Sequence, residues 1–338
     1  MTTLRAFLRR GVRAALLLSA AACGPIGSAG GDSTEPMESG ASSGTSASSG
    51  AATSGATSGS GSMASSGSDA GASGSGTGSS GAASGSATSV GCTDMATASG
   101  SVVQQYGSTQ IVSGANKTYV LQSNWWHTYA NESESYSGLS FTVHNPQGAS
   151  VPASDGAPMG FPSIFIGQYA GNASMGSNLP KQVSALTSVP TIYKTNNSTI
   201  GTSNHNAAYD VWFTQDASPL GPGQSNPGAG GAYLMVWMFK PTDRQPRGND
   251  NGRIGQTIAG VSGTWNVWVD STNPPCVSYV SATPMDGLEF DLNDFIKDAV
   301  AKGYGLKSSM YLSLVFGGFE VWGEADGLSL TQFCATVN

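Results

Sequence analysis

Charged side chains, histidines and cysteines are all scarce in this sequence. Its 338 residues include 14 Lys and Arg, 21 Asp and Glu, 3 His and 4 Cys, and the formal net charge is −7. A negative chain without a basic face argues against nucleic-acid binding, so we expect no nucleic-acid partner. Because the histidines are scattered and no Cys-x-x-Cys spacing occurs, we predict no metal site and no cofactor.

The chain also lacks long apolar runs, apart from a short one near its start. Residues Met1–Ala22 carry several arginines followed by an apolar run, and Cys23 comes directly after it, which is the order of a secretory signal. Small residues that end in a Cys resemble a bacterial lipoprotein signal. We therefore predict a signal peptide over residues 1–23, with lipidation of Cys23 as the sole membrane contact. Plain cleavage after Ala22 with release is the alternative.

Residues 24–90 are almost entirely Ser, Gly, Ala and Thr and show no apolar periodicity. Such a segment cannot bury enough surface to offset its ordering entropy, so we predict a disordered linker. As a flexible coil it would have an r.m.s. span of roughly 40 Å. We expect an exported protein whose domain this tether holds away from the bacterial cell surface, or a secreted one.

Residues 91–338 contain all 7 Trp and form the predicted folded domain, which we expect to be monomeric. Cys92, Cys276 and Cys334 are an odd number of cysteines for an exported domain. Three single disulfides are possible, and the sequence does not choose among them.

Short runs rich in β-branched and aromatic residues recur in this domain, separated by Gly, Pro, Asn and Ser. This pattern predicts an all-β sandwich or jelly roll. The expected strands are Thr118–Gln122, Leu139–His144, Ser163–Ile166, Ala207–Thr214, Tyr233–Phe239, Thr264–Val269, Val277–Val280 and Tyr311–Trp322. Asp291–Gly303 instead has apolar residues at helical spacing, acids in its first turn and a terminal Gly, which predicts one amphipathic helix packed on the domain.

The last expected strand carries an acid, Glu320. If the strand stays regular, alternation puts Phe316, Gly318, Glu320 and Trp322 on one face. An acid flanked by aromatic residues suits a sugar-binding cleft, because pyranose rings stack on aromatic faces and a partly desolvated Glu can donate a proton. A Glu at a strand end facing solvent is the alternative.

Several short sequence motifs, in their order along the chain, resemble those of the glycoside hydrolase family 12 endoglucanases. They are Asn124–Trp126, Gly156–Ser163, Asn206–Trp212, Leu234–Trp237, Gln245–Gly248, Phe290–Phe295 and Gly318–Trp322. The resemblance implies a jelly roll of two curved antiparallel sheets, with a concave face that binds β-1,4-glucan or xyloglucan. It also implies retaining hydrolysis by two glutamates.

Residue by residue, the resemblance gives Glu320 the role of general acid/base and Asp210 that of the carboxylate beside the nucleophile. Trp126 matches the aromatic platform for a glucosyl unit. Further positions in the expected substrate-binding set are Asn124, Met235, Trp237 and Trp322.

The family's nucleophile, however, is a Glu four residues before Trp237, and this position is Tyr233. No Asp or Glu occurs between Asp216 and Asp243, so a shift of register does not supply one. Tyr233 could itself attack, with Asp210 as its base. Asp210 could instead activate water for inverting hydrolysis. The third alternative is a domain that has lost its chemistry and only binds glucan.

Overall fold

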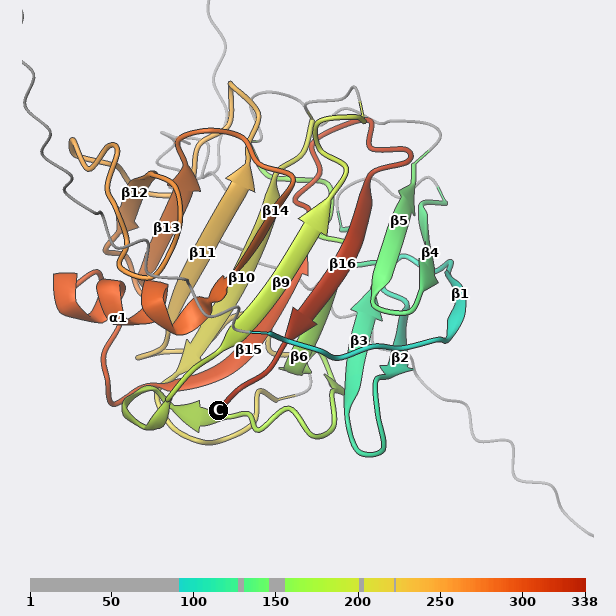
Figure 1. Cartoon of the computed structure of the whole chain (residues 1–338), viewed down its shortest axis with the longest axis horizontal. Coiled ribbons are helices and arrows are strands. Elements are labelled where there is room, and N and C mark those ends of the chain that lie inside the picture. The colour runs from blue at the N-terminus through green and yellow to red at the C-terminus, as the bar shows by residue number, and fades with distance from the viewer. Residues whose placement is uncertain (1–90, 127–130, 146–155, 201–203, 222) are drawn as a thin grey trace, which may run out of the picture. The chain divides into compact units, whose positions relative to one another are not determined.

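The computed structural model describes residues 91–126, 131–145, 156–200, 204–221 and 223–338 (Figure 1). The predicted signal peptide, Cys23 and the linker lie outside the described residues. Within the described part of the chain, no helix is long and apolar enough to cross a membrane.

Two packed β-sheets make up the domain (Figure 1). The strands are β1 (Ser99–Val102), β2 (Ser108–Val112), β3 (Thr118–Gln122), β4 (Ser133–Ser137), β5 (Ser140–His144), β6 (Ser163–Tyr169), β7 (Asn172–Ala173), β8 (Lys181–Gln182), β9 (Pro190–Thr195), β10 (Ala207–Thr214), β11 (Ala232–Phe239), β12 (Trp265–Asp270), β13 (Cys276–Ser281), β14 (Gly287–Asp291), β15 (Tyr311–Gly318) and β16 (Ser329–Ala335). A 3₁₀ turn covers Val183–Ala185, and the single described α-helix is α1 (Leu292–Lys302).

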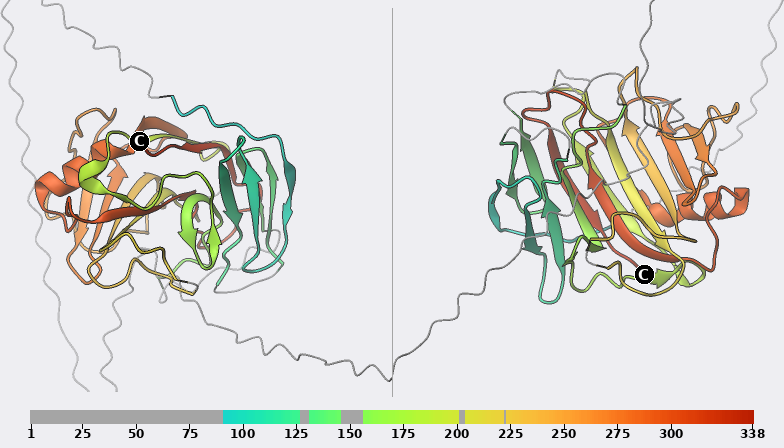
Figure 2. Two further views of the ribbon diagram at one scale, coloured as in Figure 1. Left: turned by 90° about the horizontal axis from the view of Figure 1, so that it is seen from below. Right: turned by 180° about the vertical axis from the view of Figure 1, so that it is seen from behind.

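The smaller sheet has six strands in the order β1-β4-β5-β16-β9-β14. The larger has ten, in the order β12-β13-β11-β10-β15-β6-β3-β2, with β7 and β8 added beside β6 and β15. The pairs are antiparallel except β11 and β13, which run parallel because β12 lies outside both and forms a hairpin with β13. The left view of Figure 2 shows the two sheets as separate layers.

Side chains that alternate along the central strands divide between two apolar clusters. One face of β10 points Tyr209, Val211 and Phe213 into the core between the sheets. Its other face points Ala208 and Trp212 away from the smaller sheet, into a second, aromatic-rich cluster. We call this second surface the outer face. The large sheet is therefore buried on both faces, which explains why its strands read as continuous apolar runs.

The predicted helix is confirmed, and so are the residues predicted to cap its two ends. The Asp291 side chain accepts from the Asn293 backbone N–H, and Gly303 closes the helix in a left-handed conformation with φ 68°, which Gly adopts without steric cost. Phe295 packs edge-on against Trp265 and beside Tyr279. The helix thus covers the end of the large sheet that the smaller sheet does not reach (Figure 1).

The all-β sandwich is confirmed, and each expected strand exists, although several strands, including β4, β9 and β16, were not predicted. The last expected strand was too long, because β15 ends at Gly318 and Glu320 lies beyond it. The backbone N–H of Glu320 donates to the Asn206 side chain rather than to a neighbouring strand, which interrupts the ladder. The alternation of faces nevertheless continues, since Phe319 and Val321 point into the inter-sheet core and Trp322 onto the outer face.

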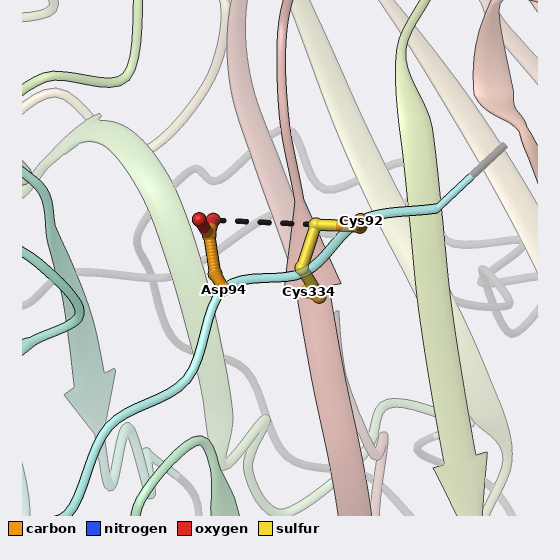
Figure 3. A group of neighbouring side chains, drawn as sticks. All are labelled: Cys92, Asp94 and Cys334. Carbon is orange, nitrogen blue, oxygen red and sulfur yellow. Dashed lines mark hydrogen bonds between the residues drawn. A yellow bond between two sulfur atoms is a disulfide. The ribbon is translucent and has the colours of Figure 1, made fainter.

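A disulfide between Cys92 and Cys334 ties the start of the domain to β16, with Cα atoms 5.8 Å apart. The Asp94 carboxylate lies 4.0 Å from Cys92 Sγ (Figure 3) and pairs with Lys117 and Tyr119. Both sulfur atoms are bonded to each other, so this group offers no thiolate and is not a metal site. It is a covalent and ionic clasp between the first described segment, the region of β3 and the last strand.

We expect this disulfide to stabilise the domain, because it closes a loop with a sequence separation of 242 residues. The double substitution Cys92→Ala/Cys334→Ala should lower the free energy of unfolding by about 2–5 kcal/mol. Urea denaturation under oxidising conditions measures this difference. Reductant should lower the urea midpoint of the parent protein by more than it lowers that of the variant. Equal urea midpoints for the oxidised parent and the oxidised variant would contradict the prediction.

Candidate active site

The register of β10 and β11 brings the predicted site residues together on the outer face. Asp210 lies opposite Met235 of β11 and opposite Phe316 of β15. Tyr233 lies opposite Trp212 and is therefore diagonal to Asp210. Met235 and Trp237 share this face, and the Trp237 Nε1–H points to the Met235 sulfur at 3.5 Å.

Glu320 is held at the site by Asn206, which directly precedes β10. The Glu320 N–H donates to Asn206 Oδ1 at 2.8 Å, and the Asn206 N–H donates to the Glu320 carbonyl at 3.0 Å. The Asn206 side-chain Nδ2 also donates to Glu320 Oε2. Glu320 Oε1 has no hydrogen-bond partner among the described residues, so one carboxyl oxygen is fixed and the other is available.

Two carboxyl groups are thus removed from water on one face, since Glu320 is 0% and Asp210 1% exposed. Burial, and then the negative charge of Asp210, raises the pKa of Glu320 to about 8, against the lowering effect of Asn206. Burial raises the pKa of Asp210 to about 7. Near neutral pH the pair therefore favours a state with at least one proton, which is the condition for a general acid.

Asp210 also has an incomplete set of partners. The Trp212 indole lowers its pKa, yet Trp212 Nε1 and Asp210 Oδ1 both lack a hydrogen-bond partner within the described structure. A contact outside hydrogen-bond geometry satisfies neither group. Asp210 therefore keeps an oxygen free to bind something else.

Tyr233 stands where the family resemblance places a nucleophilic Glu, and the structure points it onto the outer face rather than into the inter-sheet core. It is 1% exposed, and its ring meets Trp212 edge-on at 5.5 Å between centroids. Burial and the Asp210 charge raise the pKa of the phenol, while the Arg247 charge lowers it. The phenol is therefore not activated in the resting structure.

The remaining predicted binding residues differ in accessibility. Trp126 is half-buried and packs against the aromatic cluster of the outer face, as a platform residue requires. Trp322 is buried, and its Nε1 donates to the Gly156 carbonyl at 3.0 Å. Asn124 is mostly buried and has a left-handed backbone, with φ 55°.

Sequence reasoning missed three residues that the structure brings to the site or beneath it: Asn206, Arg247 and Glu134. Asn206 and Arg247 lie within motifs that resemble the family, but only the fold shows their partners. Asn206 donates to Glu320, and Arg247 donates to Asp270 at 2.8 Å. The sequence did not indicate a role for Glu134, because a Glu within a polar stretch is expected to lie on the surface. The acids Glu324 and Glu289 are exposed and lie outside the buried pair.

The raised pKa of Glu320 makes the stability of the fold depend on pH. Because the folded pKa lies above the unfolded one, the contribution of this group is fully present below its unfolded pKa and is lost as pH rises through about 8. Glu320→Gln removes that loss, so we expect it to raise the free energy of unfolding by on the order of 1–3 kcal/mol at about pH 9 and little at about pH 4.

Urea denaturation at the two pH values measures this effect. The exposed Glu289→Gln is a matched control and should show no pH-dependent gain. A Glu320→Gln variant that is equally destabilised at both pH values would contradict the prediction.

Comparison with known proteins agrees with the fold. Residues 117–338 match the family model described as glycosyl hydrolase family 12. The chain is 30% identical over 165 residues to the probable cellulase Cel12b of Mycobacterium tuberculosis, covering 48% of this chain and 100% of that protein.

Solved structures show the same fold. Endoglucanase Cel12A from Rhodothermus marinus superposes with a TM-score of 0.60 at 28% identity, over 71% of this chain and 99% of that one. A family 12 xyloglucanase from Bacillus licheniformis is similar in fold alone, with a TM-score of 0.55 at 18% identity over 71% of this chain and 100% of its own. The chain belongs to glycosyl hydrolase family 12.

Proposed function

We propose that this protein is an endo-acting hydrolase of β-1,4-linked glucan, of the cellulose or xyloglucan type. One observation carries the proposal: Glu320 and Asp210 are buried on the same face, the charge of Asp210 raises the pKa of Glu320, and each of the two keeps an oxygen without a partner among the described residues. Family membership supports the substrate class, since the relatives named above include a probable cellulase at 30% identity and an endoglucanase at 28% identity.

In the proposed mechanism Glu320 is the general acid and Asp210 the general base. Glu320 gives its proton to the glycosidic oxygen as the bond from that oxygen to the anomeric carbon breaks. Water attacks the same carbon from the opposite face and gives a proton to Asp210. Asn206 holds Glu320 Oε2, which leaves Oε1 to face the leaving oxygen.

The residue at the family's nucleophile position favours inversion over retention. Tyr233, not a Glu, stands there, diagonal to Asp210, which leaves Asp210 as the carboxyl group that could activate water. Inverting enzymes use carboxyl groups about 6.5–9.5 Å apart, whereas retaining ones need about 5–5.5 Å.

Attack by Tyr233 is the competing route within the same function. It would form a glycosyl–tyrosine ether, with the phenolic proton passing to Asp210, and would retain configuration after hydrolysis. We disfavour it, because burial and the Asp210 charge raise the pKa of the phenol. In our proposal Tyr233 fills the family nucleophile's place and closes the covalent route.

A second candidate is a glucan-binding protein without catalysis. The packing of Tyr233 on Trp212 favours it, because an aromatic residue at the nucleophile position adds a stacking and hydrogen-bonding surface. A parent protein that binds glucan without cleaving it, with cleavage appearing only in Tyr233→Glu, would identify this case.

We predict that the protein releases reducing sugar from carboxymethyl-cellulose, barley β-glucan or xyloglucan. Glu320→Gln and Asp210→Asn should each lower kcat by ~10²–10⁴-fold, the usual contribution of an acid or base. Tyr233→Phe keeps the aromatic ring but lacks the hydroxyl, and its kcat should fall by less than ~10-fold. A Tyr233→Phe variant as inactive as Glu320→Gln would contradict the inverting assignment.

We also propose that the folded part is exported and tethered through Cys23 and the Ser/Gly-rich residues 24–90. The support is the order of arginines, apolar run, small residues and Cys in the sequence. A long flexible tether would let the site reach a polymer beyond the cell surface.

The tether predicts that Cys23 determines where the protein is found. In a bacterial host, the parent protein should fractionate with membranes and label with a radioactive fatty acid, whereas Cys23→Ser should do neither. Cys92→Ala is the control and should still be labelled. Equal release of parent and Cys23→Ser into the medium would show that there is no anchor.

A further inference from the structure

The carboxyl group of Glu134 is buried between the two sheets and hydrogen-bonds to residues that follow a strand of the other sheet. This residue is on β4 of the six-stranded sheet and is 0% exposed. The strands on either side of β4 present Val102 and Val143 opposite it, and neither titrates. A buried carboxyl is costly unless hydrogen bonds compensate for the lost hydration, so its partners indicate what it is for.

Both described partners of Glu134 belong to the segment that follows β3 of the other sheet. Glu134 Oε1 accepts from the Trp125 indole N–H at 2.9 Å, and Oε2 accepts from the Ser123 hydroxyl. Glu134 therefore joins the smaller sheet to the chain on either side of Asn124.

This segment turns two consecutive tryptophans in opposite directions. Asn124 has φ 55°, a left-handed conformation that Asn tolerates better than most residues. Trp125 then lies in the inter-sheet core, and Trp126 packs on the outer face. A Cβ at Gly160 would lie 2.6 Å from the Trp125 ring, so the ring has no room to shift in that direction.

The backbone of the segment is fixed as well. The N–H groups of Trp125 and Trp126 donate to the carbonyls of Gln105 and Met159, both at 2.9 Å. The Asn124 carbonyl accepts from the Phe161 N–H at 2.9 Å. Packing against Gly160 and the hydrogen bond to Glu134 together fix the side-chain orientation of Trp125.

We propose that Glu134 is a positioning residue for glucan binding: by holding Ser123 and the Trp125 indole from within the core, it sets Asn124 and the Trp126 ring against a glucosyl unit. The inference rests on the proposed function, because it takes the outer face beside Trp126 to be the sugar-binding surface. It concerns binding and is independent of how Tyr233 affects the chemistry.

The bonds of Glu134 do not require a particular charge. Burial raises the pKa of Glu134 to about 7, Ser123 and Trp125 lower it, and the charge of Glu132 raises it. A protonated Oε2 can donate to the Ser123 hydroxyl while Oε1 still accepts from Trp125. An amide in this place offers the same donor and acceptor, so Glu134→Gln should preserve the arrangement that Glu134→Met destroys.

The test is calorimetric titration of cellohexaose into the full chain, with every protein carrying Glu320→Gln so that the ligand is not consumed. Glu134→Met should weaken binding about tenfold or more, because a misplaced binding group is expensive. Glu134→Gln should recover most of that loss. Val143→Ala is the matched control: it removes buried methyl groups opposite Glu134 and should lower stability while leaving the affinity unchanged.

Trp125→Phe provides a second measurement in case Glu134→Met does not fold. It keeps an aromatic ring in the core but removes the indole N–H together with the five-membered ring, so it should lower stability as well as weaken binding about threefold or more. Equal affinities of the parent protein, Glu134→Met and Trp125→Phe would overturn the inference, and so would an equal loss in Val143→Ala. A parent protein that does not bind cellohexaose at all would instead overturn the proposed function.

Discussion

Two carboxyl groups removed from water on the outer face of the ten-stranded sheet constrain the rest of the site. Burial raises the pKa of both Glu320 and Asp210, and the negative charge of Asp210 raises the pKa of Glu320 further. A fold keeps such groups only where their partners limit the penalty. Asn206 supplies that limit for Glu320. In our proposal, the carboxyl oxygens left without partners contact the sugar and the attacking water.

Aromatic side chains pack around Asp210 and remove its carboxyl group from water. Trp212, Tyr233 and Phe316 surround Asp210 through the register of β10, β11 and β15, so the carboxyl is desolvated by side chains that also suit a pyranose ring. On the other side of the sheet, Glu134 uses a buried carboxyl differently, because both of its oxygens are satisfied. A satisfied carboxyl holds structure in place, whereas an unsatisfied one is available for chemistry.

Much of the fold follows from sequence because its local signals agree. Asp291 and Gly303 are a capping residue and a terminal glycine at helical spacing, and they bound α1 as expected. The strands β4, β9 and β16 have weaker patterns, since they mix polar with apolar residues. The pairing partners of β9 and β16 are also distant in the chain. Glu320 was placed on a regular strand because nothing in the sequence shows that the Asn206 side chain takes over its backbone bond.

The site, too, has features that the sequence predicts and features that only the tertiary structure shows. The positions of Asp210, Tyr233 and Trp126 follow from strand alternation together with the family resemblance, and the structure puts all three on one face. The partnership of Cys92 with Cys334, and that of Glu134 with Ser123 and Trp125, required the tertiary structure, because residues from different sheets meet there without any signal in spacing. Burial, which sets the pKa values of the two acids, is likewise a property of the fold.

The most direct test of the central claim is the anomeric configuration of the first product, followed by ¹H NMR as the protein cleaves cellohexaose. If Asp210 activates water while Glu320 donates a proton, the newly formed reducing end appears first as the α-anomer and then mutarotates. If the β-anomer appears first, configuration is retained, Tyr233 or another group has formed a covalent intermediate, and the assignment of Asp210 as base is wrong.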